Sequence, residues 1–121
     1  MTTTSIGRKG EKIASDFLSK KGYIIIQNNL RNPFGEIDII ARHKTVIVFA
    51  EVKLRKSDAF ARGAEHVDRR KRERYINAAS FWLAKNAPDT QARFDVIELY
   101  GDSADLKSIK INHIENAFFA D

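Results

Sequence analysis

Residues 46–54 read Val46-Ile-Val-Phe-Ala-Glu-Val-Lys-Leu54, an apolar run that Glu51 and Lys53 interrupt. A segment that is apolar at nearly every position is typical of a central strand covered on both faces. Burying an unpaired carboxylate or ammonium there is costly unless a partner or a metal ion compensates the charge. Because Glu51 and Lys53 are two residues apart, they project from the same face, about 7 Å apart along the strand. The segment therefore predicts both the middle of a sheet and a charged site within it.

A charged residue also interrupts an apolar segment upstream, in Glu36-Ile-Asp-Ile-Ile40, where Asp38 lies among isoleucines. A short connection around His43-Lys44 joins the two apolar segments, which predicts an antiparallel hairpin. An even-numbered turn, such as His43-Lys44, would place Asp38 on the same face as Glu51. An odd-numbered turn without a bulge would place it on the opposite face. The hairpin therefore permits a cluster of these charges without requiring it.

Helical and strand periodicities predict the remaining elements. The expected order is helix, three strands, helix, strand, strand (αβββαββ), which defines an α/β fold with a mixed central sheet flanked by helices. The expected elements are a helix from about Ile6 to Lys21, strands over 23–30, 36–42 and 46–54, a helix from about Ala64 to Lys85, and strands over 93–100 and 107–114. The inward stripe of the second helix is Val67, Tyr75, Ala78, Ala79 and Trp82.

Length and composition limit the class of protein. The chain has 121 residues, the usual size of one domain, so residues 1–121 are expected to form a single domain. It has no cysteine, which excludes disulfides and thiolate metal sites. It shows neither a secretory signal nor an apolar run long enough to span a bilayer, so a cytoplasmic protein with no membrane partner is expected. The net charge of +5 suits a polyanionic partner, although many soluble proteins are basic.

The embedded charges suggest a chemistry. Two carboxylates beside a backbone carbonyl offer hard oxygen ligands suited to Mg²⁺ or Mn²⁺. Such a metal lowers the pKa of bound water and stabilises charge on a phosphodiester under attack. A neighbouring lysine can orient the water and offset the developing negative charge. Against this, a lone Glu-x-Lys on a strand is usually part of a solvated face. The apolar surroundings of Glu51 and Lys53, together with the second embedded carboxylate, favour the functional interpretation.

These residues also carry a family resemblance. Gly35-Glu-Ile-Asp-Ile-Ile40 followed by Val48-Phe-Ala-Glu-Val-Lys-Leu-Arg55 resembles the PD-(D/E)xK signature of restriction-endonuclease-like proteins. More closely, the chain resembles the YraN-like bacterial proteins, a family without an assigned function that is similar to Holliday-junction resolvases. The resemblance covers nearly the whole chain and includes Gly10-Glu11, Asn29-Leu-Arg31 and Arg93-Phe-Asp-Val96. It implies that residues 1–121 form a single nuclease-like domain with a restriction-endonuclease-like α/β fold.

The resemblance implies roles for four residues. Asp38 and Glu51 are implied as metal ligands, Lys53 as the catalytic lysine and Glu11 as an auxiliary acid from the first helix. No proline precedes Asp38, which is a departure from the signature. For Glu11, an ordinary carboxylate at the edge of the buried stripe is an equally good interpretation.

Basic side chains follow the proposed site. Lys71 falls on the inward stripe of the second helix, so its ammonium must reach solvent or find an acidic site. The basic cluster of this helix is Arg69-Arg-Lys-Arg-Glu-Arg74. Phosphate contact is its favoured interpretation, because such contact needs charge but little precise geometry. Some members must simply be solvated, since they surround the helix. The predicted nucleic-acid-binding set is Arg55, Lys56, Arg62, Arg69, Arg70, Lys71 and Arg72.

Other polar residues receive structural interpretations. Asp95 is expected to form a salt bridge with a basic neighbour. Tyr75 and Trp82 are expected in the core. His43, His66 and His113 show no metal-ligand spacing, which argues against a zinc site.

The sequence leaves three functions open. The first is metal-dependent endonuclease activity on DNA, with a branched or structured substrate suggested by the resemblance alone. The second is a non-catalytic nucleic-acid-binding module that retains the fold, and the third is an adaptor that binds a partner protein through the basic face. A homodimer would suit a junction-cutting enzyme, although the sequence shows no clear dimer surface.

Overall fold

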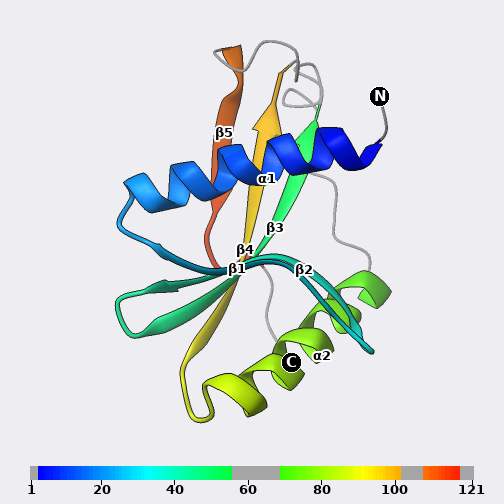
Figure 1. The fold of residues 1–121 in the computed structure, drawn as a ribbon, viewed down its shortest axis with the longest axis vertical. Helices are drawn as coiled ribbons and strands as arrows, with labels where there is room; N and C mark the ends of the chain where they lie inside the picture. The colour runs from blue at the N-terminus through cyan, green and yellow to red at the C-terminus, as the bar shows by residue number, and fades with distance from the viewer. Residues whose placement is uncertain (1–2, 56–68, 102–107, 118–121) are drawn as a thin grey trace.

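The computed structural model describes residues 3–55, 69–101 and 108–117 (Figure 1). This part of the chain forms a five-stranded sheet and two helices, which confirms the mixed α/β class. In chain order the elements are α1 (Thr3–Lys20), β1 (Ile24–Asn32), β2 (Gly35–His43), β3 (Val46–Arg55), α2 (Arg69–Asn86), β4 (Ala92–Tyr100) and β5 (Lys110–Ile114).

The sheet has the strand order β1-β2-β3-β4-β5, so β3 is central, as its apolar sequence predicts. β3 and β4 are parallel, whereas the other neighbouring pairs are antiparallel. Parallel neighbours need a crossover connection, and α2 lies in the segment between β3 and β4. The crossover brings α2 against one face of the sheet, directly over the charged part of β3.

Each helix covers one face of the sheet. Buried residues of α2, including Tyr75 and Trp82, form one core cluster with Phe49 of β3. Ala14 and Leu18 of α1 form a second cluster with Val48 on the other face. Figure 1 shows α1 and α2 on opposite sides of the curled β1–β2 hairpin. The predicted burial of Tyr75, Ala78, Ala79 and Trp82 is confirmed, and Val67 lies outside the described residues.

The turn between β2 and β3 differs by one residue from the expected His43-Lys44. His43 pairs with Val46, so the turn residues are Lys44 and Thr45. Lys44 adopts a φ of 58°, the left-handed conformation that two-residue hairpin turns require. The turn still contains an even number of residues, so Asp38 keeps the strand parity that places it with Glu51.

β2 twists sharply at Asp38. Ile39 belongs to the cluster under α1, whereas both Ile37 and Ile40 belong to the cluster under α2. Strict alternation would have placed Ile37 with Ile39. Backbone pairing with β3 ends at Ile39 and Ala50, just before this twist. The two strands therefore separate at Asp38, which opens the sheet next to Glu51.

Element boundaries move by a few residues from those expected. α1 ends at Lys20, and Gly22 follows with a φ of 92°, a conformation that favours glycine after a helix. β1 extends to Asn32, beyond the predicted end at Leu30. The start predicted for the second helix at Ala64, and that of the last strand at Lys107, lie outside the described residues. Within the described ranges, neither helix combines the length and apolar character needed to cross a bilayer.

Candidate active site

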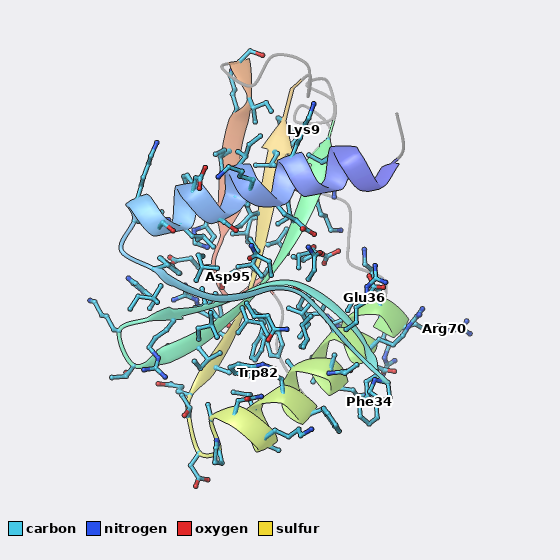
Figure 2. The ribbon with its side chains drawn as sticks, viewed as in Figure 1. Lys9, Phe34, Glu36, Arg70, Trp82 and Asp95 are labelled. Atoms are coloured by element: carbon cyan, nitrogen blue, oxygen red, sulfur yellow. The ribbon has the colours of Figure 1, made fainter. Side chains whose placement is uncertain are left out.

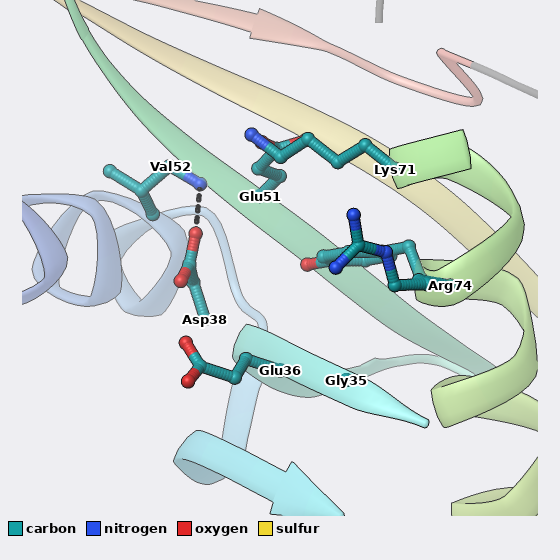
Figure 3. Close-up of a pocket in the computed structure, with 8 residues that line it drawn as sticks. Gly35, Glu36, Asp38, Glu51, Val52, Lys71 and Arg74 are labelled. Atoms are coloured by element: carbon teal, nitrogen blue, oxygen red, sulfur yellow. Dashed lines mark hydrogen bonds and ion pairs between the residues drawn. The ribbon is translucent and has the colours of Figure 1, made fainter. Parts of the chain in front are cut away.

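A cleft of about 690 Å³ opens where β2 and β3 separate, and α2 forms its other wall (Figure 3). Three charged side chains at its centre come from different elements: Asp38 from β2, Glu51 from β3 and Lys71 from α2. The remaining lining residues are Gly35, Glu36, Val52, Arg74 and Tyr75. The crossover topology thus brings α2 to the two carboxylates that the sequence singled out.

Asp38 is held by the backbone of β3. Its Oδ2 accepts a hydrogen bond from the Val52 N–H at 2.8 Å, in place of the interrupted strand pairing (Figure 3). Burial raises the pKa of the Asp38 carboxyl to about 6, against the lowering effect of this hydrogen bond. The negative charges of Glu11 and Glu51 raise the same pKa further. Asp38 is therefore a carboxyl group for which a nearby cation would be favourable.

Glu51 is almost completely buried, with its side chain 6% exposed. Its Oε1 lies 2.6 Å from the Nζ of Lys71. Its Oε2 is also buried and has no hydrogen-bond partner within the described part of the chain. An unsatisfied buried carboxylate oxygen is costly unless a ligand completes it. This oxygen is the clearest sign in the cleft that something else binds there.

Tyr75 forms part of the cleft as well as part of the core. The residue is 6% exposed. Burial raises the pKa of its phenol well above the ordinary value, and the charges of Asp38 and Glu51 act in the same direction. The phenol is therefore neutral at physiological pH and keeps its O–H as a donor beside the two carboxylates.

Lys53 and Glu11 lie near the cleft but do not line it in the described structure. Lys53 is half-buried, and strand alternation places it on the face of Glu51, two residues along β3. Glu11 lines a separate hollow formed by α1 and β1. α1 approaches the sheet closely there, since a Cβ on Gly10 would lie 2.9 Å from the Cδ2 of Leu54. Glu11 is close enough to Asp38 to affect its pKa.

The predicted basic set divides between the interior and the surface. The Nε of Arg55 lies 3.0 Å from Oε2 of the buried Glu98, and only 12% of the Arg55 side chain is exposed, so its charge is used internally. Arg69 is exposed and pairs with Glu73 one helical turn away. Arg70 is exposed and Arg72 half-buried on α2. Lys56 and Arg62 lie outside the described residues.

Lys71 has the acidic partner that its position on the helix suggested. Its pairing with Glu51 makes it a component of the cleft, not only a surface cation. Glu36 and Arg74 also line the cleft, but sequence reasoning did not place either of them at the site. Glu36 stands at the end of its apolar segment and Arg74 within a run of charges, and only the packing of α2 against the start of β2 brings them together.

The residues present fit a hard divalent cation. The donor set consists of carboxylate oxygens of Asp38 and Glu51, of which Glu51 Oε2 is unsatisfied among the described residues. Oxygen ligands of this kind are those that Mg²⁺ and Mn²⁺ prefer. A bound cation would also compensate the mutual repulsion that raises the pKa of Asp38.

A second buried carboxylate network lies between β4 and β5. Both oxygens of Asp95 accept hydrogen bonds at 2.9 Å from the Nε and Nη2 of Arg93. The Nε2 of His113 lies 2.7 Å from Oδ2, and the backbone N–H of Asn116 donates to Oδ1 at 2.9 Å. Burial alone would raise the pKa of Asp95, but the hydrogen bonds from His113, Arg93 and Asn116 outweigh it and lower the pKa. The predicted salt bridge of Asp95 is confirmed.

This network includes a candidate metal-binding group that the sequence spacing did not suggest. Asp95, His113 and Glu115 offer ligand atoms that lie within 4.8 Å of one another. However, both Asp95 oxygens are already bonded to Arg93, and a nitrogen of Arg93 lies 3.3 Å from a Glu115 oxygen. The Arg93 guanidinium thus takes the position that a metal ion would need in this group. The antiparallel pairing of β5 with β4, which the sequence does not specify, brings its members together.

The fold and the cleft define a class: a mixed α/β protein with a buried and a half-buried carboxylate where two neighbouring strands separate. The model of the uncharacterised protein family UPF0102 matches residues 10–99, so the chain belongs to this family, the YraN family. UPF0102 proteins of Caldanaerobacter subterraneus subsp. tengcongensis and Clostridioides difficile are 45% and 43% identical to it. These alignments cover 94% of both chains in the first case, and 98% of this chain and all of the relative in the second. A relative from Thermodesulfovibrio yellowstonii is 41% identical, with the same coverage as the second.

Proposed function

We propose that this protein is a metal-dependent endonuclease of restriction-endonuclease-like fold that hydrolyses phosphodiesters in DNA. The observation that carries the proposal is the buried Oε2 of Glu51, which has no hydrogen-bond partner among the described residues and belongs to a side chain that lines the same cleft as Asp38. The resemblance of the two strand segments to the PD-(D/E)xK signature supports the same assignment. Branched DNA is the substrate that the wider resemblance favours.

Asp38 and Glu51 would hold a Mg²⁺ or Mn²⁺ ion, which would activate water and stabilise charge on the phosphate. The Val52 N–H fixes the orientation of Asp38, so that one of its oxygens stays directed at β3. The two lysines have different places in the proposal. Lys53 would orient the attacking water, as the resemblance implies, and Lys71 would provide positive charge at the α2 wall.

A second candidate function is binding of nucleic acid without cleavage. The specific observation in its favour is the ion pair between Lys71 and Glu51, with its 2.6 Å separation. This pair already compensates much of the charge of Glu51 with a side chain of the protein. In a binding module, the basic side chains of α2 would contact phosphates, and the carboxylates would only position Lys71.

The test is a cleavage assay with Mg²⁺ or Mn²⁺ on linear, single-stranded, flap and four-way DNA. We expect Glu51→Gln and Lys53→Ala each to reduce cleavage at least about a hundredfold, because each removes a group that acts on the reacting phosphate. Glu36→Gln is the matched control, since Glu36 is an exposed carboxylate of the same cleft that pairs with Arg31. We expect it to cleave at nearly the wild-type rate.

Two results would contradict the proposal. Cleavage that survives both Glu51→Gln and Lys53→Ala would place the chemistry elsewhere in the protein, or in a contaminant. Binding of the whole DNA panel with no cleavage under any metal condition would favour the binding module.

A further inference from the structure

Two exposed phenylalanines lie beside the cleft. Phe34, at the turn between β1 and β2, is 45% exposed, and Phe81 of α2 is 37% exposed. Their ring centroids are 5.5 Å apart, with 51° between the ring planes. Large aromatic side chains usually contribute to a core, so an exposed pair next to a candidate active site suggests an interaction surface.

The turn that carries Phe34 is anchored to α2. The Asn32 side chain donates a hydrogen bond from Nδ2 to the carbonyl of Ala78 at 3.1 Å. Its Oδ1 accepts one from the Phe34 N–H at 3.0 Å. The next residue, Gly35, lines the cleft and lies against the backbone of Arg74. These contacts fix the position of the aromatic pair relative to the carboxylates, so the pair forms a fixed part of the edge of the cleft.

Basic and polar side chains connect the pair to the cleft. Arg70, Arg74, Asn77 and Phe81 are all exposed and follow one another at spacings of four, three and four residues. Such spacing places them on one side of a helix, over about 16 Å along its axis. Figure 2 shows Arg70, Glu36 and Phe34 on the same side of the molecule. The Nζ of Lys85 lies 5.3 Å from the centroid of the Phe81 ring, which adds a cation at the far end.

Cations on both sides of an exposed aromatic pair suit a strand whose bases are unpaired. Every unpaired base has a face that can stack on a phenylalanine, whereas bases inside a duplex are covered by their neighbours. The arginines and the lysine would contact the phosphates of the same strand. A purely apolar protein partner would not account for the positive charge along this side of α2.

We propose that Phe34 and Phe81, with Arg70, Arg74 and Lys85 of α2, form a platform for a single-stranded segment of nucleic acid next to the cleft. We call this surface the aromatic platform. The inference deepens the proposed function, on which it rests for the identity of the polymer as nucleic acid. It assigns the substrate class: a nucleic acid with unpaired bases adjoining the phosphate to be cut.

The experiment measures binding without cleavage, by fluorescence anisotropy in the presence of a chelator. Labelled single-stranded DNA and a blunt duplex that contains the same strand are the two probes. We expect Phe34→Ala and Phe81→Ala each to weaken single-strand binding at least about fivefold, because stacking of one base contributes on the order of 1 kcal/mol or more. Duplex binding should change less than about twofold. The conservative variant Phe34→Tyr, which keeps a stacking ring, should bind the single strand as the wild type does.

The matched control is Ile24→Ala, which removes a side chain that is 65% exposed at the opposite end of β1. The platform would be overturned if the two alanine variants, Phe34→Ala and Phe81→Ala, bound the single strand as tightly as Ile24→Ala does. It would also be overturned if they lost equal affinity for the single strand and for the duplex. A wild-type protein that binds neither these probes nor a four-way DNA in the same assay would refute the nucleic-acid function itself, which separates the two failures. A shift of the sedimentation coefficient in the phenylalanine variants, with unchanged DNA binding, would assign the pair to contact between copies of the chain and overturn the platform.

Discussion

Two carboxylates of the same sheet, the buried Asp95 and the half-buried Asp38, have opposite environments. Asp95 is fully buried and is held by Arg93, His113 and the Asn116 backbone, and its pKa is lowered. The Asp38 carboxylate accepts a hydrogen bond from the Val52 N–H, and burial raises its pKa to about 6. The protein supplies the compensating charge in the first case, whereas in the second the charges of Glu11 and Glu51 add to the cost. The comparison assigns Asp95 to stability, and it supports the proposed role of Asp38 as a metal ligand.

The same substitution at both positions gives the sharpest test of this difference, and the larger effect is expected at Asp95. Asp95→Asn removes the counter-charge of Arg93, whose side chain is only 20% exposed. Loss of one partner from a buried pair typically costs about 3 kcal/mol of unfolding free energy. We expect a loss of that order in urea denaturation at pH 7.5.

The pH dependence of the Asp95→Asn effect follows from the direction of its pKa. Because the folded-state pKa lies below the unfolded value, the stabilisation from Asp95 is present above the unfolded pKa and is lost as pH falls through the folded pKa. The wild type and Asp95→Asn should therefore differ most near neutral pH and converge in acid. A variant as stable as the wild type at pH 7.5 would show that the network does not stabilise the fold.

Asp38→Asn should have a smaller effect of the opposite sign. The folded-state pKa of about 6 exceeds the ordinary value of 3.8, so the native state binds more protons between these values, and ionisation of Asp38 destabilises the fold as pH rises. An asparagine can still accept the Val52 hydrogen bond without the charge. We expect a gain of at most about 3 kcal/mol at pH 7.5, because the pKa difference of about 2.2 units corresponds to about 3 kcal/mol.

The gain from Asp38→Asn should be complete above about pH 6 and absent below about pH 4. Urea denaturation of the wild type and the variant at pH 4.0, 5.0, 6.0 and 7.5 measures it. Equal stability of the two proteins at pH 7.5, or a gain that is constant across this pH range, would contradict the account of Asp38 as a half-buried acid whose ionised form is disfavoured in the folded protein.

The two regions also differ in how far the sequence predicts them. The apolar run around Glu51 identifies β3 as central, and strand parity brings Asp38 to it even though the turn is Lys44-Thr45 rather than the expected His43-Lys44. These features depend on residues close together in the chain. Alternation and turn length are sufficient to predict them.

Contacts between distant segments are not predictable in this way. The network of Asp95 requires β5 to pair with β4 in a register that brings His113 beside the carboxylate, and nothing in the local sequence fixes that register. The contact between Lys71 and Glu51 requires the position of the crossover helix on the sheet. Helical periodicity gives the face of α2 that is buried, but not which sheet residue each side chain meets.

The smallest expected effect concerns Lys71, which compensates Glu51 with an ion pair of the protein's own. A divalent ion at Asp38 and Glu51 would compete with the Lys71 ammonium for Glu51 Oε1, 2.6 Å away. Because 56% of the Lys71 side chain is exposed, the pair is worth about 1 kcal/mol or less. We therefore expect Lys71→Met to bind Mn²⁺ about two- to fivefold more tightly than the wild type, measured by isothermal titration calorimetry at pH 7.5.

Arg69→Met is the matched control for this measurement, since it also removes one positive charge from the first turn of α2. The Arg69 side chain is 83% exposed and pairs with Glu73. Arg69→Met should leave the Mn²⁺ affinity unchanged within about a factor of two, because salt screens an exposed charge that does not contact the carboxylates. Equal tightening in both variants would reduce the effect to the net charge of the helix. Weaker Mn²⁺ binding in Lys71→Met would instead mean that the ammonium holds Glu51 in the position that the ion requires, so that Lys71 supports the metal site and does not compete with it.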